Sequence, residues 1–171
     1  AWIECGELMD HAGYKWWKHA DPDIEQIQLE VVDIWHFGMS ALLTGTEDQD
    51  RLANQIVDDL SQDLVQSLTL LLATEQLAAS CVSTKCFSVS HFKALMLASD
   101  LDFDRLYRLY VGKNVLNFFR QDHGYKDGSY QKIWAGREDN EHLAEVLEDL
   151  DITSERFADQ VYDGLSERYP A

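Results

Sequence analysis

Residues 21–44, which read DPDIEQIQLEVVDIWHFGMSALLT, decide the fold. Asp21 is a natural N-cap, and Pro22 suits the first helical position because that position needs no backbone N–H donor. The stretch continues without a helix breaker to Thr44, and Gly45 follows as a stop signal. We therefore predict one long helix from Asp21 to Thr44.

Two acids of this helix, Glu30 and Asp33, stand inside an apolar run. The local sequence at 28–35 is QLEVVDIW. Residues three apart on a helix project from the same face, so the two carboxylates are expected side by side. A solvated helix face is the common explanation for such a pair, but acids embedded among apolar residues fit that explanation less well.

A second acidic pair, Glu4 and Glu7, has the same spacing in a helix expected at residues 1–12. Taken alone, this pair also fits a solvated face. Two such helices packed antiparallel would bring four carboxylates together, and their mutual repulsion is costly unless a divalent cation fills the centre. Magnesium prefers oxygen ligands and also binds substrate phosphates. The two pairs therefore predict a magnesium site.

The rest of the chain also reads as helical, with no alternating stretch long enough for a useful strand. Its 171 residues allow one domain with a substantial core and are too few for two comfortable ones. We predict a single all-α domain, a helical bundle over residues 1–171. Its further expected elements are helices at 48–79, at 91–122 with a break near 100–104, and at 139–150, a connector at 80–90, and a last helix capped by Thr153 or Ser154.

The net charge of −17 disfavours nucleic acid and anionic membranes as partners. No run of eighteen apolar residues occurs, so no membrane span is expected. Lys and Arg gather in residues 105–137, and one basic segment in an acidic protein indicates a small anionic ligand. The three cysteines are too few and too irregular for a disulfide framework or a zinc site, which indicates a reducing compartment.

A basic stripe, Lys113, Asn117 and Arg120, follows the i, i+4, i+7 spacing of one helix face. Cations bind phosphate oxygens, and an amide hydrogen-bonds a sugar hydroxyl or a phosphate. The loop at 124–132 adds lysines and tyrosine hydroxyls that could close over a polyphosphate. A solvated helix followed by an ordinary surface loop remains the alternative.

Six sequence blocks stand out along the chain: ECGE at 4–7, KWWK at 15–18, EVVD at 30–33 with Phe37, GKNVLNFFRQ at 112–121, HGYK at 123–126 and YQKIWAGREDN at 130–140. Together they resemble the dimeric, all-α dUTP pyrophosphatases. Any one block is weak, but all of them in the expected order are specific, and they cover roughly a third of the chain. The chain lacks the glycine-rich phosphate loop of P-loop proteins, so its fold is expected to be a different one.

The resemblance implies hydrolysis of dUTP, and of dUDP, to dUMP, with pyrophosphate released from dUTP. By this likeness Glu4, Glu7, Glu30 and Asp33 would bind more than one magnesium ion. Glu4 would also orient and deprotonate the attacking water, as the catalytic residue. The role implied in the cell is to limit uracil incorporation into DNA and to supply dUMP for thymidylate synthesis.

The resemblance also implies the substrate contacts. Asp33 and Asn117 would reach the deoxyribose 3′-hydroxyl, and Phe37 would pack on the sugar and leave no room for a 2′-hydroxyl. Trp16 would help to enclose the uracil. The phosphates would be held by Lys113, Arg120, Tyr125 and Lys132.

Uracil itself is read in the family by amide side chains that precede the first acidic motif. This chain begins at that motif, so we expect the base-reading segment to lie outside it. A homodimer is expected, with one subunit completing the site of the other. The expected location is the cytoplasm of a bacterium, for a protein of bacterial or phage origin.

Two other functions stay open. One is an all-α pyrophosphatase for another nucleotide such as dCTP, which the acidic pairs alone do not distinguish from a dUTPase. The other is a regulatory binding protein of the same fold without catalysis. The presence of every motif acid and cation disfavours the second alternative.

Overall fold

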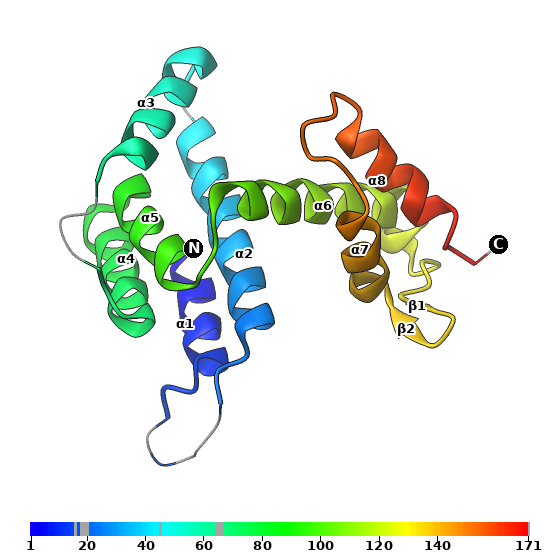
Figure 1. The fold of residues 1–171 in the computed structure, drawn as a ribbon, viewed down its shortest axis with the longest axis horizontal. Coiled ribbons are helices and arrows are strands. Elements are labelled where there is room, and N and C mark those ends of the chain that lie inside the picture. The colour runs from blue at the N-terminus through cyan, green and yellow to red at the C-terminus, as the bar shows by residue number, and fades with distance from the viewer. Residues whose placement is uncertain (16, 18–20, 45, 64–66, 171) are drawn as a thin grey trace. The chain divides into compact units, whose positions relative to one another are not determined.

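The computed structural model describes residues 1–15, 17, 21–44, 46–63 and 67–170. Helices make up nearly all the regular structure of this part of the chain, so the all-α prediction is confirmed (Figure 1). The chain divides into two compact units, Ala1–Asp102 and Phe103–Ala171. The expectation that both belong to one domain stays a prediction.

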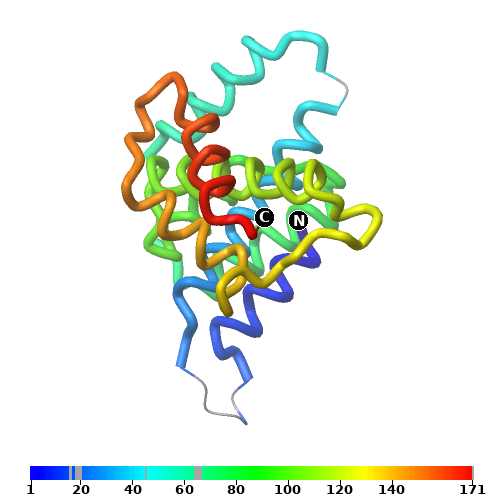
Figure 2. Tube along the Cα trace, turned by 90° about the vertical axis from the view of Figure 1, so that its right-hand side faces the viewer, coloured from blue at the N-terminus to red at the C-terminus, as the bar shows by residue number. Residues whose placement is uncertain are grey.

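The first unit is built from α1 to α5. In this unit α1 packs against α2 and α4, and α5 packs against α3 and α4. Both views show α1 and α2 as neighbouring helices that run in opposite directions, as expected for the two acidic pairs (Figures 1 and 2). The helices are α1 (Trp2–His11), α2 (Ile24–Leu43), α3 (Gln49–Ser61), α4 (Leu70–Thr84) and α5 (Val89–Ala98).

Apolar positions of α2 form the centre of the first unit. Val31, Val32 and Ile34 are fully buried, because they lie on the face of α2 that turns away from solvent. Trp35 stacks on Phe92 of α5 with 4.7 Å between the ring centroids. Burial of these side chains is the main source of stability of the unit and fixes the rotation of α2 about its axis.

The predicted N-cap of α2 was wrong by two residues. Asp23, not Asp21, is the N-cap, and its carboxylate accepts a hydrogen bond from the Gln26 amide at 3.2 Å. Pro22 therefore precedes the helix instead of opening it. The Asp23 amide in turn donates to the His11 carbonyl at 3.0 Å, which ties the start of α2 to the end of α1.

The predicted helix at 48–79 was also wrong, because the chain forms two helices there. α3 ends at Ser61, and α4 begins after Thr69, whose hydroxyl caps it by accepting from the Leu72 amide. The three- and four-residue spacing of leucines continues from α3 into α4, so the sequence pattern predicted one continuous helix. The connector is shorter than expected, since α4 runs to Thr84 and Ser88 caps α5.

The second unit is built around one long helix, α6 (Phe103–Asp122). The predicted break before it is confirmed, because α5 ends at Ala98. Both α7 and α8 pack on α6 and on each other. The elements that follow α6 are the 3₁₀ turn η1 (Tyr125–Asp127), the strands β1 (Ile133–Trp134) and β2 (Arg137–Glu138), and the helices α7 (Asp139–Glu148) and α8 (Phe157–Ser166).

A short hairpin joins η1 to α7 in this unit. The strands pair antiparallel, and both residues of their two-residue turn, Ala135 and Gly136, have positive φ angles, as tight hairpin turns require. Trp134 of the hairpin and Phe119 of α6 are fully buried in the core of the unit. The last helix starts at Phe157, so the predicted caps Thr153 and Ser154 were wrong; no side chain caps it.

No helix of the described ranges is both long and apolar enough to cross a membrane.

Candidate functional site

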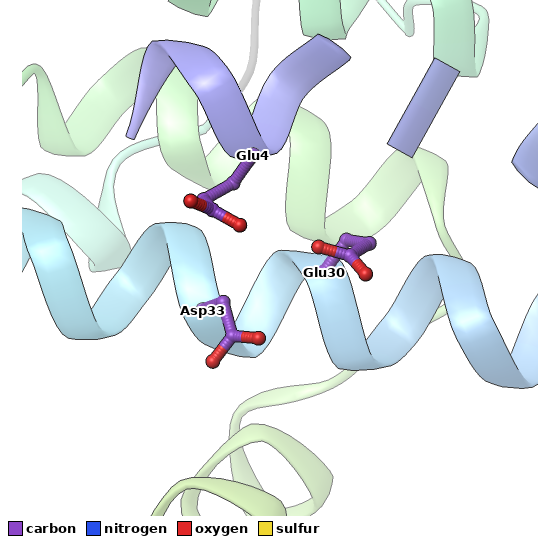
Figure 3. A group of neighbouring side chains, drawn as sticks. All are labelled: Glu4, Glu30 and Asp33. Carbon is purple, nitrogen blue, oxygen red and sulfur yellow. The ribbon is translucent and has the colours of Figure 1, made fainter. Parts of the chain in front are cut away.

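Three acidic side chains of the first unit converge between α1 and α2 (Figure 3). Each of Glu4, Glu30 and Asp33 offers a carboxylate oxygen, and these oxygens all lie within 4.8 Å of one another. All three residues are partly buried, and the Glu30 side chain is only 12% exposed. Three like charges this close repel one another, and a divalent cation is the usual means of offsetting that repulsion.

The local fold explains why these acids meet. Leu8 of α1 and Val31 of α2 are fully buried, so the two helices pack through their apolar faces. The hydrogen bond between Asp23 and His11 fixes the connection at one end of the pair. The acids then stand at the margin of the packed faces, where residues three apart on α2 face the same side.

Two neighbours define the chemistry of this acidic group. His11 Nε2 lies 3.9 Å from Glu30 Oε1, so an imidazole stands at its edge. Cys5 follows Glu4 in sequence, but burial raises the pKa of its thiol to about 12, with a smaller contribution from Cys81. The thiol is not among the three converging ligands, which are all carboxylates. Such a set suits a hard cation.

The other site residues predicted in this unit lie outside the group of three. Glu7 is exposed on α1, one turn after Glu4, and is not among the acids that come within 4.8 Å. Phe37 stands one turn after Asp33 and is 52% exposed, so its ring is accessible. Trp16 lies outside the described residues.

The predicted basic stripe lies on α6 in the second unit. Lys113 is partly buried and Asn117 is exposed on the same helix. Arg120 forms two hydrogen bonds with the buried carboxylate of Asp139, and its Nη1 donates to Asn117 Oδ1 at 3.4 Å. The structure thus connects two residues of the stripe and gives one of them an acidic partner.

The two predicted loop residues, Tyr125 and Lys132, lie between Arg120 and Asp139 along the chain. Tyr125 is exposed, and its ring meets that of Tyr130 edge-on at 6.1 Å between centroids. Lys132 forms an ion pair with Glu138 at 3.1 Å, immediately before Asp139. Arg120 and Lys132 are thus each paired with an acid at the start of α7, Asp139 and Glu138.

Sequence reasoning included Tyr130 only among the tyrosine hydroxyls of the 124–132 loop, and it assigned no individual role to His11, Tyr130 or Asp139. The last two stand inside the quoted 130–140 block, but no helical spacing links them to Arg120. Their hydrogen bonds join α6, the loop and α7, which are distant in sequence. The proximity of His11 to Glu30 follows from the antiparallel packing of α1 and α2, which a residue pattern does not encode in detail.

Comparison with known proteins identifies the family of the chain. No curated protein matches the sequence. A family model described as dUTPase matches residues 1–125, which include the acidic group and the basic stripe. Lys132, Tyr130 and Asp139 lie beyond the matched residues. The match covers well over half of the chain and agrees with the helical fold, and the chain therefore belongs to the all-α dUTPase family.

Proposed function

We propose that this protein hydrolyses dUTP, and also dUDP, to dUMP with the help of magnesium, and that it releases pyrophosphate from dUTP. Membership of the dUTPase family supports dUTP hydrolysis in general. The observation that carries the metal requirement is the convergence of Glu4, Glu30 and Asp33 from two helices. Removal of dUTP would limit uracil incorporation into DNA, and dUMP would feed thymidylate synthesis.

The acidic group fits a magnesium cofactor because its three converging donors are carboxylate oxygens. A bound magnesium ion would supply Lewis-acid polarisation of the phosphate and of a bound water. Glu30 and Asp33 would hold the ion. Glu4 would also accept the proton of the attacking water, and Glu7 would contribute to binding a second ion.

The substrate contacts are proposed residue by residue. Asp33 and Asn117 would bind the 3′-hydroxyl of the sugar, while Phe37 would fill the space that a 2′-hydroxyl needs. Trp16 would enclose the base. Cations and hydroxyls of the second unit would stabilise the charge that develops on the leaving group. These residues are Lys113, Arg120, Tyr125 and Lys132.

We further propose that the protein acts as a homodimer in the bacterial cytoplasm. The three free cysteines support a reducing compartment. Its proposed small-molecule partners are dUTP and dUDP.

A substrate panel tests the proposal directly. Purified protein with magnesium is expected to release dUMP from dUTP and dUDP, and to turn over dCTP, dTTP and UTP far more slowly. Comparable rates with dCTP would support the pyrophosphatase for another nucleotide. The absence of hydrolysis combined with tight dUTP binding would support the regulatory protein.

Two controls test the chemistry. Glu4→Gln keeps the shape of the side chain but removes the base, so kcat should fall by about 100-fold or more. Excess EDTA should abolish hydrolysis, and added magnesium should restore it. Full activity in EDTA would refute the metal requirement.

A further inference from the structure

Asp139, the first residue of α7, has a fully buried side chain that contacts Arg120 with both carboxylate oxygens. Arg120 Nε donates to Oδ2 at 2.8 Å and Arg120 Nη2 donates to Oδ1 at 2.9 Å. The Tyr130 hydroxyl donates to the same Oδ2 at 2.8 Å. A planar guanidinium bound at two points by a carboxylate has its orientation fixed.

The backbone around Asp139 is fixed by hydrogen bonds. The backbone amide of Asp139 donates to the Lys132 carbonyl at 3.0 Å, which ties the loop to α7. Glu138 and Glu141 form a capping box at the start of α7, so the first turn is well defined. A negative charge in the first turn also interacts favourably with the helix dipole. Asp139 is therefore a rigid support.

The pair leaves part of Arg120 available for a ligand. A guanidinium has five N–H donors, and Asp139 uses one on Nε and one on Nη2. The remaining donors are on Nη1 and Nη2, and Nη1 faces the exposed residue Asn117 at 3.4 Å. The Arg120 side chain is 18% exposed, while that of Asp139 is fully buried. The accessible edge of the pair is thus the cationic one.

We propose that Asp139, supported by Tyr130, is a positioning residue that holds the Arg120 guanidinium ready to bind the phosphates of dUTP. This inference rests on the proposed function and adds a residue beyond the family match. Because Asp139 offsets much of the charge of Arg120, the arginine acts mainly through directed hydrogen bonds. The Tyr130 hydroxyl also donates to the Asp139 carboxylate, which partly offsets the negative charge of Asp139. More of the positive charge of Arg120 therefore acts on the substrate.

The pair is also coupled electrostatically. Burial alone would raise the pKa of Asp139, but the hydrogen bonds from Arg120 and Tyr130 outweigh it and lower the pKa overall. The carboxylate is therefore ionised throughout the neutral range, as a support for a cation requires.

Asp139→Asn tests the inference, because an asparagine has the same shape but replaces one acceptor oxygen with a donor. We expect KM for dUTP to rise by about 10- to 100-fold, the range for a lost charge-assisted hydrogen bond, with a smaller change in kcat. Calorimetric binding of inorganic pyrophosphate should weaken in parallel, and this readout needs no turnover. Glu145→Gln is the matched control, since Glu145 lies on α7, pairs with Arg168 at 3.3 Å and is exposed. It should leave KM unchanged.

A double-mutant cycle separates positioning from a merely structural role. In an Arg120→Gln background, Asp139→Asn should have little further effect on KM, because it acts through Arg120. The inference would be overturned if Asp139→Asn reduced the amount of active protein equally in the wild-type and Arg120→Gln backgrounds and left KM unchanged in both. If Asp139→Asn does not fold, Tyr130→Phe carries the test, with KM expected to rise about threefold and no rise counting against the inference. Wild-type protein that does not hydrolyse dUTP would instead overturn the proposed function.

Discussion

Glu4 of α1 and Asp33 of α2 bring carboxylate oxygens within 4.8 Å of each other, although their helices are separated by a connecting segment of the chain. Glu30 completes the group (Figure 3). Such proximity of ionised groups is unfavourable in the absence of a cation. A bound divalent cation would offset this repulsion and would thereby stabilise the first unit.

Glu30→Gln should lower kcat/KM for dUTP by about 100-fold, because a carboxylate that is only 12% exposed in the group would lose its charge. The matched control is Asp10→Asn on α1, since Asp10 is exposed and pairs with Lys15 at 2.7 Å. Steady-state kinetics of both variants at saturating magnesium would check this. A similar loss of kcat/KM in both variants would show that activity depends on the total negative charge of α1 and α2 and not on the three converging acids.

Glu7→Gln should reduce the number of metal ions bound per chain and should leave the first ion in place. The reason is that Glu7 stands on the same helix as Glu4 but is not one of the three converging acids. Titration with Mn²⁺, followed by electron paramagnetic resonance, would count the ions. An unchanged count would exclude Glu7 as a ligand, and a complete loss of binding would place it at the first ion.

Phe37→Ala should lower discrimination between dUTP and UTP by about tenfold, because a smaller side chain leaves space for the 2′-hydroxyl. The ring is 52% exposed and so can contact a ligand. Phe103→Ala is a suitable control, since that ring is 51% exposed and lies in the second unit. Equal ratios of kcat/KM in the wild type and Phe37→Ala would refute the steric explanation of sugar choice.

Asp139→Asn should lower the free energy of unfolding by about 2–4 kcal/mol at neutral pH, because it leaves Arg120 without its ionised partner. The pKa of Asp139 is lower in the folded protein than the ordinary value of 3.8, so its contribution is complete above that value. The contribution disappears as the pH falls through the lowered pKa. Urea unfolding at several pH values should thus show the difference between the variant and the wild type shrinking below about pH 4.

The helical class and the approach of Glu4 to Glu30 and Asp33 could be predicted because spacing along a helix determines which residues share a face. Glu7 was predicted in the same group but lies outside it. The start of α2 could not be placed, since Asp21 and Asp23 both precede the apolar run and only hydrogen-bond geometry distinguishes them. The break between α3 and α4 has no glycine or proline to mark it in the described residues around Gln62 and Thr69.

The partner of Arg120 was missed for a different reason. Its contact with Asp139 depends on how α7 packs on α6 and on the hairpin that leads into α7. Local patterns carry information on neighbours along one helix, whereas this ion pair is set by tertiary packing. The sequence motif had included Asp139 without indicating what it touches.

The buried thiol of Cys5 has a consequence for metal selectivity. Zinc and cadmium bind tightly to accessible cysteine sulfur, but this sulfur is 1% exposed. The three side chains that converge beside it offer only oxygen donors. Burial of Cys5 thus leaves carboxylates as the ligands that an entering ion would meet.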